Sequence, residues 1–119
     1  MNRNPGSGTR LWFDTELRKL KIPTEKVNGY DQVVSTHSEA ASEVQSSRAD
    51  AALGLQAAAH KYKLDFIPLF EERYDLVLPR ENKKTLLPLL DYLQTSAFRA
   101  ELSALTGYNS THSGEQIPL

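Results

Sequence analysis

A tight turn that leads directly into a helix is the feature that most constrains this chain. Residues 4–6, Asn-Pro-Gly, are a strong turn signal, because proline presets its φ angle and glycine accepts the positive φ that follows. Residues 9–22 then repeat apolar side chains at helical spacing, and Pro23 ends the pattern. The apolar face consists of Phe13, Leu17 and Leu20. We therefore expect a helix here, and because no element is expected before the turn, we expect part of the fold to lie upstream.

The size and composition of the chain exclude several classes of protein. Its 119 residues predict one domain or part of one, and a net charge of −1 without a basic stripe argues against direct contact with nucleic acid. The chain has no cysteine, which excludes disulfides, thiolate metal sites and cysteine nucleophiles. No apolar run approaches the roughly 20 residues that span a bilayer, and the N-terminus has no signal-like apolar stretch. We expect a cytoplasmic protein that does not contact a membrane.

Short apolar runs alternate with helical patterns along the first half of the chain. Residues 30–35 alternate in polarity as a strand does. Residues 36–47 begin with a capping-box pattern, Thr-His-Ser-Glu, and favour a helix. Residues 49–53 are short and apolar, which is typical of a buried strand, and residues 56–62 have high helix propensity. This alternation predicts an α/β fold.

The second half of the chain continues with β-like and helical runs. The β-like runs are residues 64–69 and 74–78, and the helical runs are residues 86–93 and 97–105. Within the first of these, residues 66–69 are expected to form a second buried strand. Pro88 suits the first turn of a helix, and Gly107 is expected to be a C-cap. The polar tail, residues 109–119, is expected to be frayed.

The segment Gly-Ser-Gly-Thr-Arg at residues 6–10 places several anion-binding groups at the start of the first helix. Glycines such as Gly8 let a ligand approach the backbone, and the first helical amides are free to donate at the positive end of the helix dipole. Ser7 and Thr9 add hydroxyl donors, and Arg10 adds a positive charge. The segment is neither a Walker loop nor a dinucleotide fingerprint, because the lysine and the third glycine are absent. The alternative interpretation is a plain glycine turn in which Ser7 or Thr9 is only an N-cap.

A second helix start, at Thr36, His37 and Ser38, supplies another set of amides without intrahelical partners. Taken alone, this start is better interpreted as an ordinary cap, because capping boxes are common. Taken with the first, it gives two hydroxyl-bearing helix N-termini, which suit a tetrahedral oxyanion because neutral amides and hydroxyls can surround it.

The sequence has no pattern that indicates catalysis or metal binding. His37, His60 and His112 are too scattered to suggest a metal site, and the charged connection at residues 71–75 is expected to be solvated. No nucleophile or acid–base pair can be inferred from spacing. We therefore expect no catalytic residue, no metal and no cofactor, and a protein that is not an enzyme.

Six segments occur in an order that resembles a known family. They are NRNPGSGTR at residues 2–10, THSEAA at 36–41, RADAALG at 48–54, AAA at 57–59, LDFIPL at 64–69 and ERYDLV at 72–77. Together they resemble the periplasmic-binding-protein-like domain that is related to molybdate- and tungstate-binding proteins. That domain is found C-terminal in molybdopterin biosynthesis proteins and behind helix-turn-helix regions in molybdate-type regulators.

The resemblance implies one lobe plus part of the second lobe of a type II periplasmic-binding-protein-like fold, which closes on an oxyanion between its lobes. Residues 1–64 would form the oxyanion-binding lobe, residues 65–108 the crossover strands and C-terminal helices of the second lobe, and residues 109–119 a tail. The ligand-binding residues that it implies are Ser7, Gly8, Thr9, Thr36, His37 and Ser38, with Arg10 and Tyr74 as weaker candidates.

Two functions remain open at this point. The first is reversible capture of a small oxyanion, molybdate or tungstate, in molybdenum-cofactor biosynthesis or molybdate-responsive regulation, including as a fusion part of a molybdopterin biosynthesis enzyme. The second is a truncated interaction or regulatory remnant that keeps the fold without the ligand. We also expect a homodimer or a higher oligomer, because a truncated lobe would expose apolar side chains in residues 86–105. These side chains are Leu87, Leu90, Leu93 and Phe98.

Overall fold

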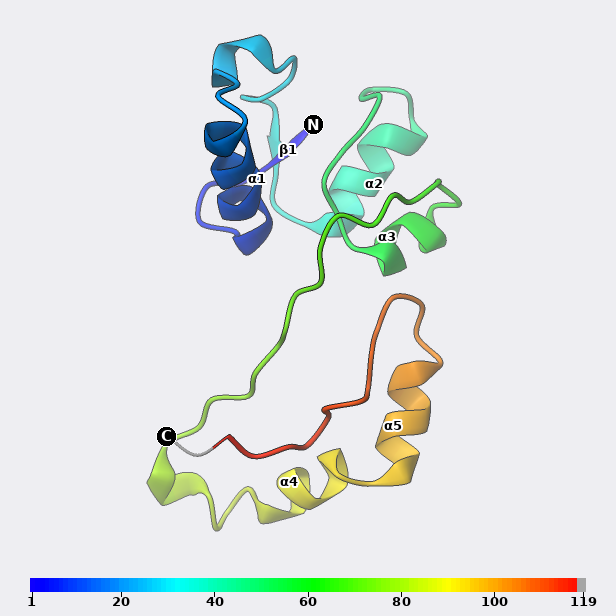
Figure 1. Cartoon of the computed structure of the whole chain (residues 1–119). Coiled ribbons are helices and arrows are strands. Elements are labelled where there is room, and N and C mark those ends of the chain that lie inside the picture. Colours follow the sequence, from blue (N-terminus) through cyan, green and yellow to red (C-terminus); the bar gives the residue numbers. More distant parts are fainter. Residues whose placement is uncertain (118–119) are drawn as a thin grey trace. The chain divides into compact units, whose positions relative to one another are not determined.

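The computed structural model describes residues 1–117, and the chain divides into two compact units, Met1–Ile67 and Pro68–Leu119 (Figure 1). The first unit contains strands β1 (Asn2–Arg3) and β2 (Val33–Val34), helices α1 (Gly8–Lys19), α2 (His37–Gln45) and α3 (Gln56–Lys61), and a 3-10 helix at Thr24–Lys26. The second unit contains a 3-10 helix at Arg80–Asn82 and helices α4 (Leu87–Leu93) and α5 (Ser96–Ser103). The mixture of helix and sheet agrees with the predicted class, whereas the assignment of these segments to lobes of a type II fold stays a prediction.

The first unit is organised around its two strands. β1 pairs in parallel with β2, with Arg3 opposite Val34. Backbone hydrogen bonds extend the pairing on both sides, from Asn2 N to Gln32 O at 2.8 Å and from Asn4 N to Val34 O at 3.1 Å. Parallel strands need a crossover connection, and α1 lies within it. The carboxyl ends of both strands therefore lie at the same edge of the sheet.

The expectation that no element precedes the first turn is wrong, because β1 lies directly before it. Asn2 and Arg3 are only 3% and 6% exposed, although neither residue favours strands by propensity. Asn2 Nδ2 donates to Tyr30 O at 3.0 Å, and Arg3 N donates to Asn2 Oδ1 at 2.8 Å. Pairing with a distant segment and side-chain hydrogen bonds hold this strand in place. The strand predicted at residues 30–35 is confirmed only at its centre, Val33–Val34.

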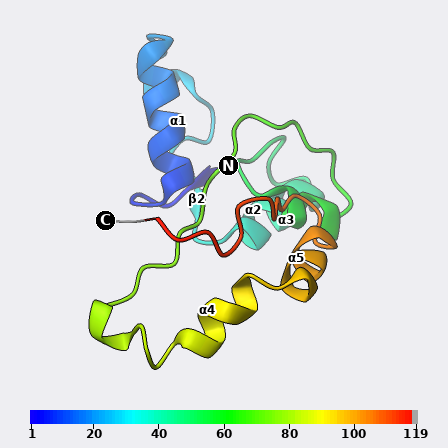
Figure 2. The ribbon, with the colours of Figure 1, turned by 60° about the horizontal axis from the view of Figure 1, so that its bottom comes forward.

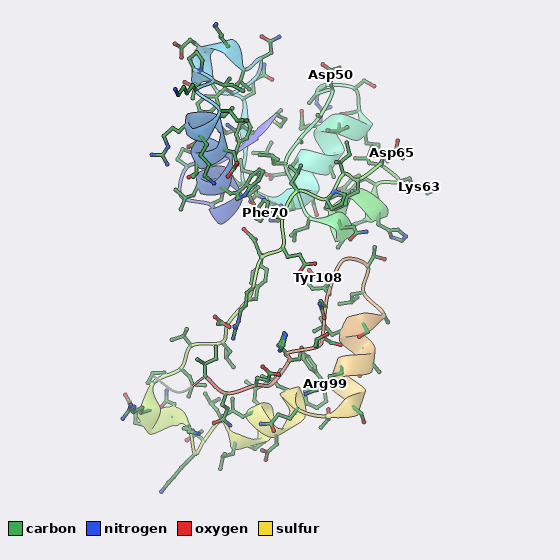
Figure 3. The ribbon with its side chains drawn as sticks, viewed as in Figure 1. Asp50, Lys63, Asp65, Phe70, Arg99 and Tyr108 are labelled. Carbon is green, nitrogen blue, oxygen red and sulfur yellow. The ribbon has the colours of Figure 1, made fainter. Side chains whose placement is uncertain are left out.

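The three helices of the first unit all end in a Schellman motif, in which a residue with positive φ follows the C-cap. After α1, Lys21 has a φ of 54°, and its amide donates to Arg18 O at 3.1 Å while Ile22 N donates to Leu17 O at 2.9 Å. The corresponding residues after α2 and α3 are Ser47, with a φ of 59°, and Lys63, with a φ of 56°. Figure 3 labels Lys63 after the end of α3.

These motifs end the helices earlier than predicted. The prediction for α1 extended to residue 22, but the helix ends at Lys19. Leu20 is therefore the C-cap and is 66% exposed, so it does not belong to the buried face. Helices α2 and α3 are confirmed at residues 37–45 and 56–61, within the ranges expected for them.

Small side chains make up most of the core of the first unit. Its buried apolar residues are Leu17, Ala40, Ala41 and Ala58. Helix α2 packs against α3 and β2, and α1 packs against β1, as Figure 1 shows. Because alanine side chains are short, such faces let neighbouring elements approach closely. The buried polar residues Asn2, Arg3 and Thr9 complete the interior, so hydrogen bonds replace part of the usual apolar contact.

The buried strands predicted at residues 49–53 and 66–69 are not present. Residues 49–53 form no strand and are half-buried or exposed, with one bond from the Met1 terminal ammonium to Ala51 O at 3.1 Å. Residues 66–69 and 74–78 are also outside strands, and all of them except the half-buried Leu78 are exposed, with Ile67 at 79%. An apolar run becomes a strand only where a neighbouring backbone pairs with it, and within residues 1–117 the sole pairing is β1 with β2.

The helices of the second unit agree closely with the sequence patterns. Pro88 lies in the first turn of α4, and Thr95 caps α5 by accepting from Phe98 N at 3.1 Å. The rings of Tyr92 and Phe98 meet edge to face at 5.5 Å between centroids and connect the two helices. Gly107 has a positive φ of 86° but is not the C-cap, because α5 ends at Ser103 and Ala104 caps it. Leu87 is 45% exposed, and Leu90, Leu93 and Phe98 are half-buried.

The tail contacts the second unit at residues 113–116, which differs from the frayed tail that was expected; Figure 1 and Figure 2 trace its path. Arg99 Nη2 donates to Ser113 O at 3.1 Å, and Lys83 Nζ donates to Gln116 Oε1 at 3.1 Å. Gly114 has a φ of 80°, and a Cβ atom there would lie 2.8 Å from Leu93 O, so only glycine allows this close approach. Residues 118–119 of the predicted tail lie outside the described residues.

None of the helices described in residues 1–117 has both the length and the apolar character needed to cross a membrane.

We expect glycine at the three left-handed positions to stabilise the chain. Lys21→Gly, Ser47→Gly and Lys63→Gly should each raise the free energy of unfolding by about 0.5–1 kcal/mol, because the left-handed conformation costs residues with a Cβ but not glycine. Urea denaturation followed by circular dichroism measures the change. Glu16→Gly, inside α1, is the control and should destabilise by about 1 kcal/mol. A loss of stability in all three variants would contradict the assigned backbone conformations.

We expect the chain to be a dimer at micromolar concentration, associating through the apolar surface of residues 86–105. Leu87→Glu should convert it to a monomer, because the change places a charge in that surface. Ile67→Glu changes an apolar residue that is 79% exposed outside the surface, and it should leave the dimer intact. Multi-angle light scattering measures the mass of each form, and a monomeric wild type would contradict the prediction.

Candidate functional site

Two helices begin at the edge of the sheet where β1 and β2 end. β1 ends at Arg3 and is followed by α1 at Gly8, and β2 ends at Val34 and is followed by α2 at His37. Because the strands are parallel, both helix N-termini lie at their carboxyl edge, where ligands bind in open α/β sheets. The structure therefore brings the two predicted segments, residues 7–9 and 36–38, to one edge.

The turn before α1 uses the hydroxyl of Ser7 as a cap. Gly6 has a φ of 88°, and Ser7 N donates to Asn4 O at 3.3 Å, which closes the turn. Ser7 Oγ accepts from Arg10 N at 3.2 Å and donates its proton to Asn4 O at 3.0 Å. Ser7 is thus the N-cap of α1. A ligand would receive the hydroxyl proton of Ser7 only in exchange for the bond to Asn4.

The backbone amides of Gly8 and Thr9 are the hydrogen-bond donors of this turn that have no acceptor in the described part of the chain. Neither amide forms a hydrogen bond within the described part of the chain, as expected for the first turn of a helix. Gly8 is exposed, whereas Thr9 is 7% exposed. The amide of Gly8 therefore belongs to an exposed residue, whereas that of Thr9 belongs to a buried one.

Arg10 is held by the side chains of the first unit. Its Nε donates to Asp14 Oδ1 at 2.9 Å and Oδ2 at 3.1 Å, and its guanidinium lies 4.2 Å from the ring centroid of Tyr30. Tyr30 OH also donates to Asp14 Oδ1 at 2.9 Å. Burial lowers the pKa of Arg10, but the hydrogen bonds and charges of Tyr30 and Asp14 outweigh it, so that its pKa lies above the ordinary value. The positive charge of Arg10, which was expected to contact a ligand, is therefore balanced by the carboxylate of Asp14.

The N-terminus of α2 carries the full capping box that the sequence predicts. Thr36 Oγ1 accepts from Glu39 N at 3.0 Å, and Glu39 Oε2 accepts from Thr36 N at 3.0 Å and Ser35 N at 2.8 Å. These backbone amides of Ser35 and Thr36 hold the pKa of Glu39 below its ordinary value. A carboxylate thus already lies at this helix start. The half-buried residues His37 and Ser38 follow it as the first residues of the helix.

Arg3 connects β1 to the start of α2, and sequence analysis assigned it no role. Its Nη2 donates to Ser35 O at 2.9 Å, and its Nη1 lies 2.6 Å from His37 Nδ1. A guanidinium only donates, so Nδ1 of His37 accepts and the imidazole proton is on Nε2. A Cβ atom on Gly54 would lie 3.9 Å from the same Nδ1, which places this glycine beside His37.

Part of the guanidinium of Arg3 has no partner among the described residues. Arg3 is 6% exposed, and its Nε is buried without a hydrogen-bond acceptor, as is Asn4 Oδ1 without a donor. Within residues 1–117 no carboxylate forms an ion pair with Arg3. The signal that sequence reasoning missed is an arginine immediately before the turn that leads into α1.

Tyr74, the remaining candidate, lies in the second unit. It is 72% exposed on a segment without helix or strand, and its hydroxyl donates to Glu72 Oε2 at 3.4 Å. Its part in a ligand site therefore stays a prediction. The described residues contain no group of three or more His, Asp or Glu side chains placed to hold a metal ion.

Comparison with known proteins identifies one family and two relatives. A family model described as a PBP superfamily domain matches residues 1–94. The chain is 40% identical over 117 residues to the uncharacterized protein YvgK of Bacillus subtilis (strain 168), with 98% of this chain aligned. It is 35% identical over 110 residues to the "uncharacterized protein in ferredoxin 2Fe-2S gene 5'region" of Clostridium pasteurianum, which covers 90% of this chain and 97% of that protein. The chain spans 38% of the length of YvgK. No solved structure matches the chain significantly.

We expect the start of α2 to respond to acid through Glu39. A carboxyl group with a lowered pKa in the folded chain stabilises the fold fully above its ordinary value of 4.5, and the contribution is lost as the pH falls through the lowered pKa. The amide proton shifts of Ser35 and Thr36 in NMR spectra should therefore titrate with a midpoint below 4.5. Glu39→Gln should remove this transition, and Glu115→Gln in the second unit should not. A midpoint at or above 4.5 would contradict the capping geometry.

Proposed function

Because the chain belongs to the PBP superfamily, whose domain covers residues 1–94, we propose that it is a binding module for a small oxyanion and not an enzyme. The binding is reversible and has no covalent step. The candidate ligands are molybdate and tungstate, which follow from the resemblance of the ordered segments to molybdate- and tungstate-binding domains. The role that fits such a module is molybdenum-cofactor biosynthesis or molybdate-responsive regulation.

The observation that carries the proposal is the meeting of two helix N-termini at the carboxyl edge of β1 and β2. Each N-terminus presents backbone amides without intrahelical partners, and the two dipoles add positive potential at the same edge. Gly8 supports this assignment because it is exposed and its amide has no hydrogen-bond partner in the described part of the chain, and Arg3 supports it because a buried guanidinium lies beside the start of α2. Neutral amides and one cation suit an anion whose charge is spread over four oxygens.

In this proposal the starts of α1 and α2 both donate hydrogen bonds to the ligand, but they do not contribute equally. The amides of Gly8 and Thr9 donate to ligand oxygens from the first turn of α1, and the amides of His37 and Ser38 donate from α2. Glu39 limits the second set, since its carboxylate already accepts from Ser35 and Thr36. The α1 start is therefore the main anchor of the ligand.

The second candidate function is an interaction or regulatory remnant that keeps the fold without the ligand. Two observations favour it: the hydroxyl of Ser7 already donates to Asn4 O, and the carboxylate of Glu39 already lies at the start of α2. Exposed apolar residues of the second unit, such as Leu87 and Leu105, supply a surface for assembly.

Isothermal titration calorimetry with molybdate, tungstate and sulfate tests the proposal. Ser7→Ala should weaken binding by about 10- to 100-fold, because it removes a hydroxyl and loosens the cap that holds the Gly8 and Thr9 amides. Gly8→Val should weaken it further by blocking the approach of the anion. Thr95→Ala is the matched control, since Thr95 caps α5 in the same way as Ser7 caps α1, and it should leave binding unchanged.

Two outcomes would contradict the oxyanion proposal. Equal affinity in wild type, Ser7→Ala and Gly8→Val would mean that the ligand binds elsewhere. A wild type that is folded by circular dichroism and binds none of the three anions would favour the interaction remnant instead.

A further inference from the structure

Arg3 is a buried cation that forms no ion pair with any of the described residues. It is 6% exposed, and the partners of its two terminal nitrogens are neutral: the carbonyl of Ser35 and the imidazole of His37. By contrast, Arg10 pairs with Asp14 and Arg48 pairs with Glu43. The charge of Arg3 helps to lower the pKa of Glu39, but the two side chains form no ion pair within residues 1–117.

The Nε–H of Arg3 is a donor with no acceptor inside the described part of the chain. Buried donors in proteins nearly always have a partner, and an unpaired one indicates a water or an ion at that place. A buried charge that forms no ion pair is costlier still, because desolvation of the cation is offset only by longer-range attraction, here to Glu39. Both features indicate that an anion belongs beside this guanidinium.

The position of Arg3 agrees with this inference. Arg3 is the last residue of β1, and its guanidinium bonds to residues 35 and 37 at the start of α2, a helix of nine residues. It therefore lies at the edge where the amides of both helix starts converge. The buried guanidinium and the helix start are independent features of one place.

We propose that Arg3, and not Arg10, is the charged residue of the site, and that it makes the site specific for doubly charged tetrahedral oxyanions. This inference rests on the proposed oxyanion function. The Nε–H of Arg3 donates to one ligand oxygen, while the amides of the helix starts bind the others. Arg10 contributes little net charge, because Asp14 balances it at 2.9 Å.

Tungstate and perrhenate test the charge selection, because both ions are tetrahedral and nearly equal in size while only tungstate is doubly charged. Wild type should bind tungstate more tightly than perrhenate. In Arg3→Gln the ratio of the tungstate affinity to the perrhenate affinity should fall at least about tenfold. In Arg3→Lys, which keeps the charge, the ratio should stay close to that of wild type even if both affinities fall.

The matched control is Arg99→Gln. Arg99 also donates to a backbone carbonyl, that of Ser113, and its loss changes the net charge of the chain equally. This variant should keep the wild-type ratio. If Arg3 had a purely structural role, Arg3→Gln would weaken the binding of tungstate and of perrhenate by the same factor. An unchanged ratio of the two affinities in that variant therefore overturns the inference.

A measurement on the wild-type chain covers the case in which Arg3→Gln does not fold. The Nε–H resonance of Arg3, assigned by its disappearance in Arg3→Lys, should shift saturably as tungstate is added, together with the amide of Gly8. If the Gly8 amide shifts and the Arg3 resonance does not, the partner of Nε is a water and the inference is wrong. If wild type binds neither ion, the oxyanion function itself fails, and this inference fails with it.

Discussion

The parallel pairing of β1 with β2 is the contact on which the first unit depends. It is short, two residues on each strand, yet it brings the starts of α1 and α2 to one edge. Side chains reinforce it where a wider sheet would use more strands: Arg3 Nη2 reaches Ser35 O, Asn2 Nδ2 reaches Tyr30 O, and Arg10 Nη1 donates to Arg3 O at 3.1 Å. The polar residues of β1 thus hold together the edge on which the candidate site is built.

The helices could be predicted from the sequence because their signals are local. Thr36 and Glu39 are three residues apart and cap α2 as expected, and Pro88 lies in the first turn of α4. The predicted strands failed because an apolar run such as residues 49–53 needs a partner strand that spacing cannot reveal. The helix ends were misplaced because residues such as Lys21 adopt the left-handed conformation that usually signals itself by glycine.

The candidate site was partly predictable for the same reason. The exposed position of Gly8 follows from a glycine turn before a helix, and the balancing of Arg10 by Asp14 follows from their spacing of four residues on one helix. Arg3 could not be assigned a role, because its partner Ser35 lies 32 positions further along the chain. Local patterns therefore locate the helix start that presents the amides, whereas only the tertiary contacts identify the buried cation.

The alanine-rich interior of the first unit affects how the chain responds to temperature. Its buried apolar side chains are one leucine and three alanines, and Asn2, Arg3 and Thr9 are buried with them. Exposure of apolar surface raises the heat capacity of an unfolding chain, whereas exposure of polar groups lowers it. Because this interior is small in apolar area and rich in polar groups, its heat-capacity change on unfolding is low for its length. The free energy of unfolding therefore changes little with temperature, because a small heat-capacity change gives a stability curve with little curvature.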